Sequence, residues 1–191
     1  MGNAIKNEDV RQFVAIIPGQ GTLDSIEEIL GPCKSDIWSK NIRWQARDSI
    51  HLTLRFLGKT RKEQSDRLKS ALSDLCRSMD NFALNLGFLT VLPGLTKARV
   101  VCVGIKQNHA LEHLAKHIEQ IAINCSFAPE KKPFKPHITL GRCRNLDLRK
   151  YEPKRDFQSI SMHVTGVDLV RSTLYTHGAV YNSLSTFGFA R

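Results

Sequence analysis

Two short stretches, His51-Leu52-Thr53-Leu54 and His137-Ile138-Thr139-Leu140, share one pattern of histidine, aliphatic residue, threonine and leucine. Their composition predicts two β-strands. Alternate residues of a strand point to the same face, so each histidine stands beside its threonine, about 6.6 Å away, while the aliphatic residues face the opposite side. Each copy therefore predicts a strand that is anchored in the core and presents one imidazole and one hydroxyl.

The segments before the two copies also repeat. Each copy follows a predicted buried strand and then a predicted helix. These segments are 11–17 and 23–30 in the first half, and 99–105 and 110–123 in the second. We expect Thr22 or Asp24 to cap the first helix. Arg11 and His51 are 40 residues apart, and Arg99 and His137 are 38 residues apart. Two units of nearly equal length predict two related lobes.

The remaining segments fit around these units. A helix is predicted from Lys62 to Arg77, and strands are predicted over 82–92 and 157–171. The halves are not identical, because a long helix follows the first copy and a charged loop follows the second. At this length we expect one domain over residues 1–191.

Composition narrows the classes of protein. Hydrophobic residues make up 41% and charged residues 24%, and the formal net charge is +10. The first two values are ordinary for a globular protein with a core, and the third favours a polyanionic partner such as RNA. No apolar stretch is long enough to cross a membrane, and the first nine residues lack the apolar core of a secretion signal. We therefore expect a cytoplasmic protein with no membrane partner, and its five scattered cysteines predict reduced, mostly buried thiols.

A doubled His-x-Thr pattern suits cleavage of a phosphodiester. Displacement at phosphorus needs a base for the attacking water and an acid for the departing oxygen, and near neutral pH one imidazole can be neutral while another is protonated. Two threonine hydroxyls can donate to the non-bridging oxygens. The motifs hold no carboxylate for a metal ion, so we expect no metal and no other cofactor. A single copy is a common strand pattern, but two copies in matching places favour catalysis.

Longer stretches around these residues resemble the 2H phosphoesterase superfamily, and within it the bacterial RNA 2',3'-cyclic phosphodiesterase (2'-5' RNA ligase) family. The similarity runs from about Arg11 to Tyr181, and Val101-Cys102 departs from it where relatives commonly have tryptophan. The stretches that carry it are 11–16, Arg43-Trp44 with 51–58, 99–105, 133–142, and 169–174 with Gly178 and Tyr181.

The resemblance implies an α+β fold of two lobes related by a pseudo-two-fold axis, with antiparallel sheets lining a central groove and helices outside. It also implies hydrolysis of RNA 2',3'-cyclic phosphate ends to a 2'-phosphate, with reversible 2'-5' joining of RNA ends as a weaker activity. His51 would protonate the departing 3' oxygen and His137 would activate water; the residues alone do not say which is acid and which is base. The other positions implied are Thr53, Thr139 and Arg142 around the phosphate, and Phe56 against a base.

Other polar residues have plainer interpretations. The histidines at 109, 113 and 117 fall opposite the apolar face of their helix and are expected on a solvated surface rather than at a metal. His163 and His177 are expected to be structural, and Trp44 is expected in the core. Basic residues flank the two motifs and either form a positive rim to the groove or are ordinary solvated charges: Lys59, Arg61, Lys62, Lys131, Lys132 and Lys135.

Two other functions remain open at this point. One is an RNA-binding module without catalysis, although such a descendant has no need to keep all four motif side chains. The other is a related enzyme, either a ligase of tRNA halves or a hydrolase of 2'-5' oligoadenylates or of a small cyclic nucleotide. We expect a monomer that binds RNA or a nucleotide ending in a 2',3'-cyclic phosphate.

Overall fold

A computed structural model describes residues 10–150, 156–176 and 178–191. The helices are α1 (Gln20–Ser35), α2 (Lys62–Arg77) and α3 (His109–Asn124). Three short 3-10 turns span Ile37–Asn41, Arg47–Ser49 and Leu95–Lys97. The strands are β1 (Val10–Ile16), β2 (Arg43–Trp44), β3 (Leu52–Thr60), β4 (Phe82–Leu92), β5 (Ala98–Ile105), β6 (His137–Leu146), β7 (Asp156–Val164), β8 (Gly166–Tyr175) and β9 (Gly178–Gly188).

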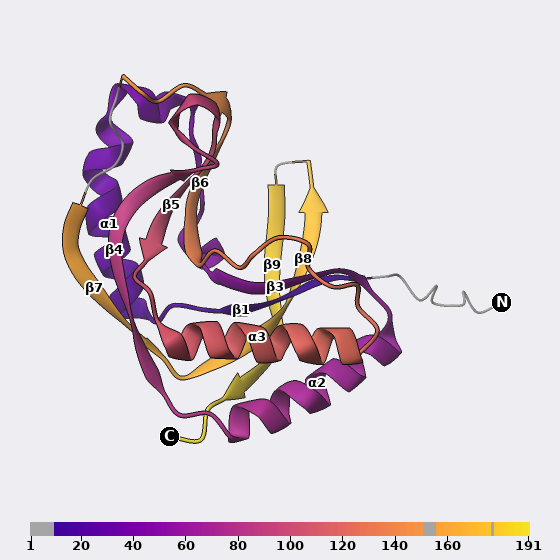
Figure 1. The fold of residues 1–191 in the computed structure, drawn as a ribbon. Helices are drawn as coiled ribbons and strands as arrows, with labels where there is room; N and C mark the ends of the chain where they lie inside the picture. Colours follow the sequence, from indigo (N-terminus) through magenta and orange to yellow (C-terminus); the bar gives the residue numbers. More distant parts are fainter. Residues whose placement is uncertain (1–9, 151–155, 177) are drawn as a thin grey trace.

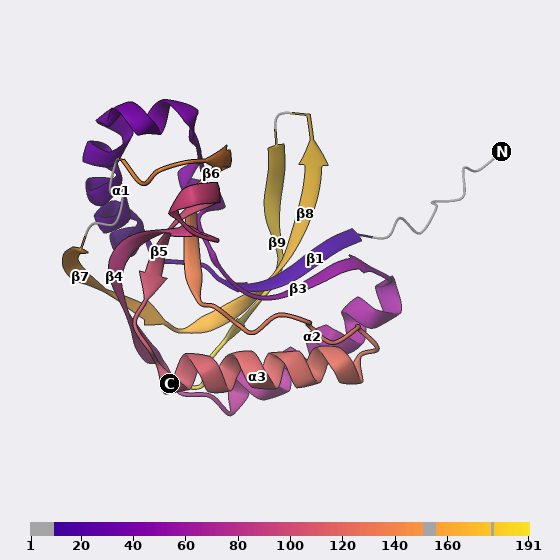
Figure 2. The ribbon, with the colours of Figure 1, turned by 45° about the horizontal axis from the view of Figure 1, so that its top comes forward.

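The strands form one curled antiparallel sheet. Their order is β7-β4-β5-β6-β3-β1-β8-β9, and the short strand β2 pairs with β6. The two halves of the sheet meet where β3 and β6 pair through Leu52 and Ile138. In Figures 1 and 2 the β8–β9 hairpin stands across from β5 and β6, so that the curled sheet has a concave face.

The two halves correspond strand by strand about that junction. β3 matches β6, β1 matches β5, and each half adds two further antiparallel strands outside. The connection from β1 to β3 contains α1, and the connection from β5 to β6 contains α3. The expected α+β fold with its duplicated unit and antiparallel strands is therefore confirmed.

Helices cover the outer side of the curled sheet, opposite its concave face. α1 packs on β7, α3 packs on β3, and α2 packs on α3 and β9 (Figure 1). The aliphatic residues of both motifs, Leu52, Leu54, Ile138 and Leu140, are buried in the same apolar cluster as the inner faces of the helices. Because alternate residues of a strand point to opposite faces, burial of these four side chains on the helix side leaves the histidines and threonines of the motifs on the concave side.

The first helix differs from its predicted extent. α1 begins at Gln20 after Gly19 and continues through Pro32, and no side chain caps its first turn, so the expectation of Thr22 or Asp24 as a cap was wrong. The reason is the apolar face: Leu23, Ile26, Leu30 and Cys33 are buried at helical spacing, and their burial extends the helix across Gly31-Pro32.

The predicted strand over 157–171 is divided between two strands. β7 pairs with β4 in one half and β8 pairs with β1 in the other, so the chain crosses from one half to the other near Gly166. A Cβ at Gly166 would lie 2.3 Å from the carbonyl oxygen of Phe187 on β9. The close approach of that strand accounts for a glycine at this crossing.

The cysteines and the other histidines also have defined places. All five cysteines are free thiols and four are buried, as predicted. The histidines at 109, 113 and 117 lie on the exposed face of α3, and His163 is exposed on β7, while His177 lies outside the described residues. No helix within the described residues has the length and apolar character of a membrane span.

Candidate active site

The pairing of β3 with β6 brings the two motifs together. β3 and β6 pair through Leu52 and Ile138, so the neighbours of Leu52 in the first motif, His51 and Thr53, flank the same junction as His137 and Thr139 of the second. The paired aliphatic residues are completely buried, so the two histidines and two threonines share the other, concave face, where all four are half-buried. The charge of His137 acts on His51, so the two imidazoles lie near each other at the junction of the halves.

The two imidazoles are held in the same way. Nδ1 of His51 lies 2.7 Å from the carbonyl oxygen of Ser49, and Nδ1 of His137 lies 2.8 Å from that of Lys135. A carbonyl oxygen can only accept a hydrogen bond, so each Nδ1 carries the proton and donates it two residues back along the chain. In the neutral ring this leaves Nε2 of each histidine with a free lone pair.

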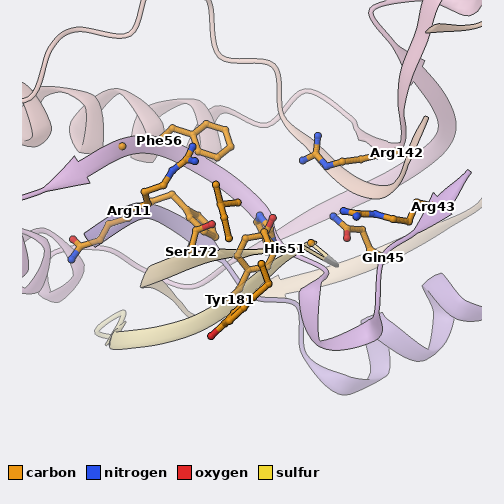
Figure 3. Close-up of a pocket in the computed structure, with 15 residues that line it drawn as sticks. Arg11, Arg43, Gln45, His51, Phe56, Arg142, Ser172 and Tyr181 are labelled. Atoms are coloured by element: carbon orange, nitrogen blue, oxygen red, sulfur yellow. The ribbon is translucent and has the colours of Figure 1, made fainter. Parts of the chain in front are cut away.

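A groove of about 560 Å³ opens beside His51 on the concave face. Arg142 and Phe56 line it, as the sequence predicted, whereas Thr53, Thr139 and His137 are not among its lining residues. Figure 3 shows Arg43, Gln45 and Arg142 at one end of the groove and Arg11 and Phe56 at the other, with His51 and Tyr181 between them. The groove therefore runs past His51, from Arg43 and Arg142 at one end to Arg11 and Phe56 on the first half of the sheet at the other (Figure 3).

Aromatic rings surround His51. The ring centroids of Phe13 and Tyr181 each lie 4.9 Å from that of His51, and Phe56 lies 5.9 Å from Phe13. Burial lowers the pKa of His51 against the opposing effect of its bond to the Ser49 carbonyl, and the charges of Arg142 and His137 lower it further. The free protein thus favours the neutral form of His51.

Two arginines stand next to each other at the site. Arg43 on β2 pairs in register with Arg142 on β6, and both line the groove. The Arg43 guanidinium also approaches Gly178, at the start of β9, since a Cβ on that glycine would lie 3.2 Å from its Nη2. The two guanidiniums give this end of the groove a positive charge, which attracts an anion.

Arg55 is a site-related residue that the sequence reading missed. Its side chain is only 7% exposed and forms an ion pair with Glu119 on α3. The same guanidinium donates hydrogen bonds to the carbonyl oxygens of Phe56 and Ala128, and Nη1 lies 3.8 Å from Glu130. Arg55 therefore ties β3 to the segment that runs from α3 to His137.

The remaining predicted positions divide between core and surface. Trp44 packs against the core beside Trp38, at 6.1 Å between ring centroids, as expected. The basic residues considered as a rim are all exposed, and two of them, Arg61 and Lys62, line a second hollow at the start of α2. Within the described residues, no three His, Cys, Asp or Glu side chains gather in the geometry of a metal site.

This fold is that of a 2H phosphoesterase, as the sequence resemblance indicated. The profile of the 2'-5' RNA ligase superfamily matches residues 32–175. The chain therefore belongs to the 2'-5' RNA ligase superfamily.

Curated relatives agree with this placement. An RNA 2',3'-cyclic phosphodiesterase of Methanothermobacter thermautotrophicus is 27% identical over 93% of this chain and 98% of the relative. One of Bacillus subtilis is 32% identical over 52% of this chain and 55% of the relative.

Solved structures share the whole architecture. The protein TT0787 of Thermus thermophilus superposes with a TM-score of 0.81 at 25% identity, covering 94% of this chain and 98% of that one. LigT of E. coli superposes with a TM-score of 0.78 at 26% identity, covering 96% and 99%. LigT has also been crystallised with 3'-AMP and with phosphate.

Proposed function

We propose that this protein is a metal-independent RNA 2',3'-cyclic phosphodiesterase that leaves a 2'-phosphate. The observation that supports the proposal is the Leu52–Ile138 pairing, which joins the two motifs, together with the matching Nδ1 hydrogen bonds of His51 and His137. Relatives named RNA 2',3'-cyclic phosphodiesterase support hydrolysis of a cyclic phosphate as the reaction. The acid–base chemistry of histidine and the hydroxyls of threonine support the mechanism.

Each half contributes one proton-transfer group. Nε2 of His137 takes a proton from water, whose oxygen forms a bond to phosphorus. The bond from phosphorus to the 3' oxygen breaks, and Nε2–H of His51 gives that oxygen a proton. The products are a 3' hydroxyl and a 2' phosphate monoester. This division between acid and base follows the family resemblance, and the symmetric anchoring of the rings is compatible with the reverse division.

The threonines and Arg142 stabilise the negative charge of the phosphate. The hydroxyls of Thr53 and Thr139 donate to the non-bridging oxygens, where negative charge is concentrated in the transition state. Arg142 adds a cation at the groove beside His51. A bound cyclic phosphate is an anion, so it favours the charged form of His51 and offsets the burial that lowers the pKa of this histidine in the free protein. Substrate binding thus favours the protonated imidazole that His51 needs in order to act as an acid.

The groove provides a place for the nucleoside. Phe56 is 59% exposed at its wall, which leaves the ring face available for stacking on a base. Stacking of this kind is worth about 1–3 kcal/mol per base. The complex of LigT with 3'-AMP offers a precedent for a nucleotide bound to this fold.

The position of the phosphate in the product tests the proposal. RNA ending in a 2',3'-cyclic phosphate is incubated with the protein and with excess chelator, and the products are separated against 2'- and 3'-monophosphate standards. We expect only the 2' monoester, at a rate that chelator leaves unchanged. A 3' monoester, a chelator-sensitive rate, or tight RNA binding with no turnover would each contradict the proposal.

The name of the family, the 2'-5' RNA ligase superfamily, indicates a second reaction at the same site, the joining of RNA ends. If a 5' hydroxyl of another RNA replaces water, the same displacement forms a 2'-5' phosphodiester and frees the 3' hydroxyl. We expect this joining to need both histidines and to be much slower than hydrolysis, because water is far more concentrated than RNA ends.

A further inference from the structure

A pair of cations lies on β1 and β3 at the end of the groove that Arg11 lines, although Lys59 itself is not among the lining residues. Arg11 on β1 pairs in register with Lys59 on β3, and both side chains are exposed. Neither forms an ion pair with another described residue. Like charges directly across a ladder repel each other. Such a pair costs stability unless an anion binds between the two side chains.

The pair faces the same side of the sheet as the active site. Arg11 is two residues before Phe13 on β1 and lines the groove with it, so both point to the concave face. On β3 a bulge lies between the partners of Gln12 and Phe13, where Leu57 has no partner. This extra residue turns Lys59 to the same face as Arg11.

Distance separates the pair from the reacting phosphate. Arg11 is five residues from Ile16, whose partner Leu52 follows His51. Five steps along a strand amount to about 17 Å. The rings of Phe13 and Phe56, 5.9 Å apart, lie between. A single nucleotide whose cyclic phosphate sits at the histidines and whose base reaches Phe56 carries no second phosphate for Arg11 and Lys59.

We propose that Arg11 and Lys59 bind backbone phosphates of the RNA strand on the 5' side of its cyclic end. The order of reacting phosphate, aromatic rings and cation pair along the groove matches the order of cyclic phosphate, bases and upstream phosphates along a single strand. The preferred substrate is therefore an oligonucleotide with a cyclic end, and a nucleoside 2',3'-cyclic phosphate is a poorer substrate. This inference rests on the proposed function.

Kinetics on a series of chain lengths test it. Hydrolysis of adenosine 2',3'-cyclic phosphate is compared with that of two-, four- and six-nucleotide RNAs that have the same cyclic end. We expect kcat/KM to rise about tenfold or more from the mononucleotide to the four-nucleotide RNA, and R11A/K59A to abolish most of that rise. The charge-preserving R11K/K59R should keep it. The matched control K34A/K116A, which removes two exposed charges on α1 and α3, should also keep it.

Binding gives a second readout that does not depend on turnover. Anisotropy of a labelled six-nucleotide RNA with a 2'-phosphate end is measured across salt concentrations. Loss of two phosphate contacts should make the slope of log affinity against log salt shallower by about 1.4 in R11A/K59A.

The two proposals fail in different ways. If the mononucleotide and the RNAs are hydrolysed equally well by the wild type, the inference is overturned and the proposed function stands. If R11A/K59A loses the same fraction of kcat/KM on the mononucleotide and on RNA, the inference is also overturned. The two side chains would then maintain the shape of the groove and would not bind upstream phosphates. If nothing is hydrolysed, the proposed function fails, and the salt slope alone decides whether Arg11 and Lys59 bind RNA. An unchanged slope there refutes the inference, as does binding of acidic peptide in preference to RNA.

Discussion

Replacement of Arg55 by methionine should destabilise the protein and impair the site at once. The change removes the cation that pairs with Glu119 and donates to the carbonyls of Phe56 and Ala128. Loss of one partner from a buried ion pair costs about 3–5 kcal/mol. Glu119 is 29% exposed, so water relieves part of the penalty and the lower end, about 3 kcal/mol, applies. At this chain length that is a fall in Tm of about 6–12 °C.

Arg77 provides the matched control for Arg55. It forms an ion pair with Asp74 at 2.7 Å, but both side chains are about 70% exposed. The same change there, R77M, should cost less than about 1 kcal/mol. The double variant R55M/E119M should recover part of the stability lost in R55M, since it leaves no unpaired carboxylate at position 119.

Thermal unfolding followed by circular dichroism measures these differences. In parallel, kcat/KM on a cyclic mononucleotide is measured at a temperature below the unfolding transition of R55M. We expect R55M to lose activity and R77M to keep it, because the Arg55 side chain fixes the segment that leads to His137. A Tm for R55M equal to that of R77M, or full activity in R55M, would refute the role assigned to this guanidinium.

Three further predictions concern the site. R142Q should raise the pKa of His51, because the Arg142 charge lowers it; the imidazole titration followed by NMR measures the change. H51A should lose less activity on bis(4-nitrophenyl) phosphate than on a cyclic nucleotide, since nitrophenolate departs without an acid, whereas H137A should lose activity on both. G104A should cost about 1–3 kcal/mol in urea unfolding, because its Cβ would lie 2.2 Å from the Phe88 ring.

Each of these has an opposing outcome, and G104A also has a control. A lowered or unchanged pKa of His51 in R142Q would show that the two side chains do not interact. Equal losses on both substrates for H51A would favour the reverse division between acid and base. G31A is the control for G104A, since nothing lies within 4 Å of its Cβ. A stability for G104A at or above that of G31A would contradict the close packing on β5.

The sequence predicted the elements whose signals are local. The bounds of α2 and β4 agree with the structure because hydrophobic periodicity begins and ends at the same residues as the elements. The paired motifs were found for the same reason, since each is four residues long. α1 was predicted too short because Gly31-Pro32 is a local stop signal that burial of Cys33 overrides.

The arrangement around the motifs depends on pairing that one sequence does not contain. No local sequence pattern indicates that Leu52 pairs with Ile138. Nor does one indicate that β8 pairs with β1, or that the Tyr181 ring lies 4.9 Å from the His51 ring. Arg55 was also missed, because an arginine that continues a strand motif has the same appearance in a sequence whether it is exposed or buried. Its partners are 64 and 73 residues away in the chain.

Hydrolysis of a cyclic mononucleotide by H51A, H137A and the double variant tests the central claim most directly. If both imidazoles act on one phosphorus atom, each single variant should lower kcat/KM by about 10²–10⁴-fold while the near-ultraviolet circular dichroism stays native. The double variant should be little worse than either single one, because the two groups act as a unit. A folded single variant that turns over substrate at the wild-type rate would contradict the account.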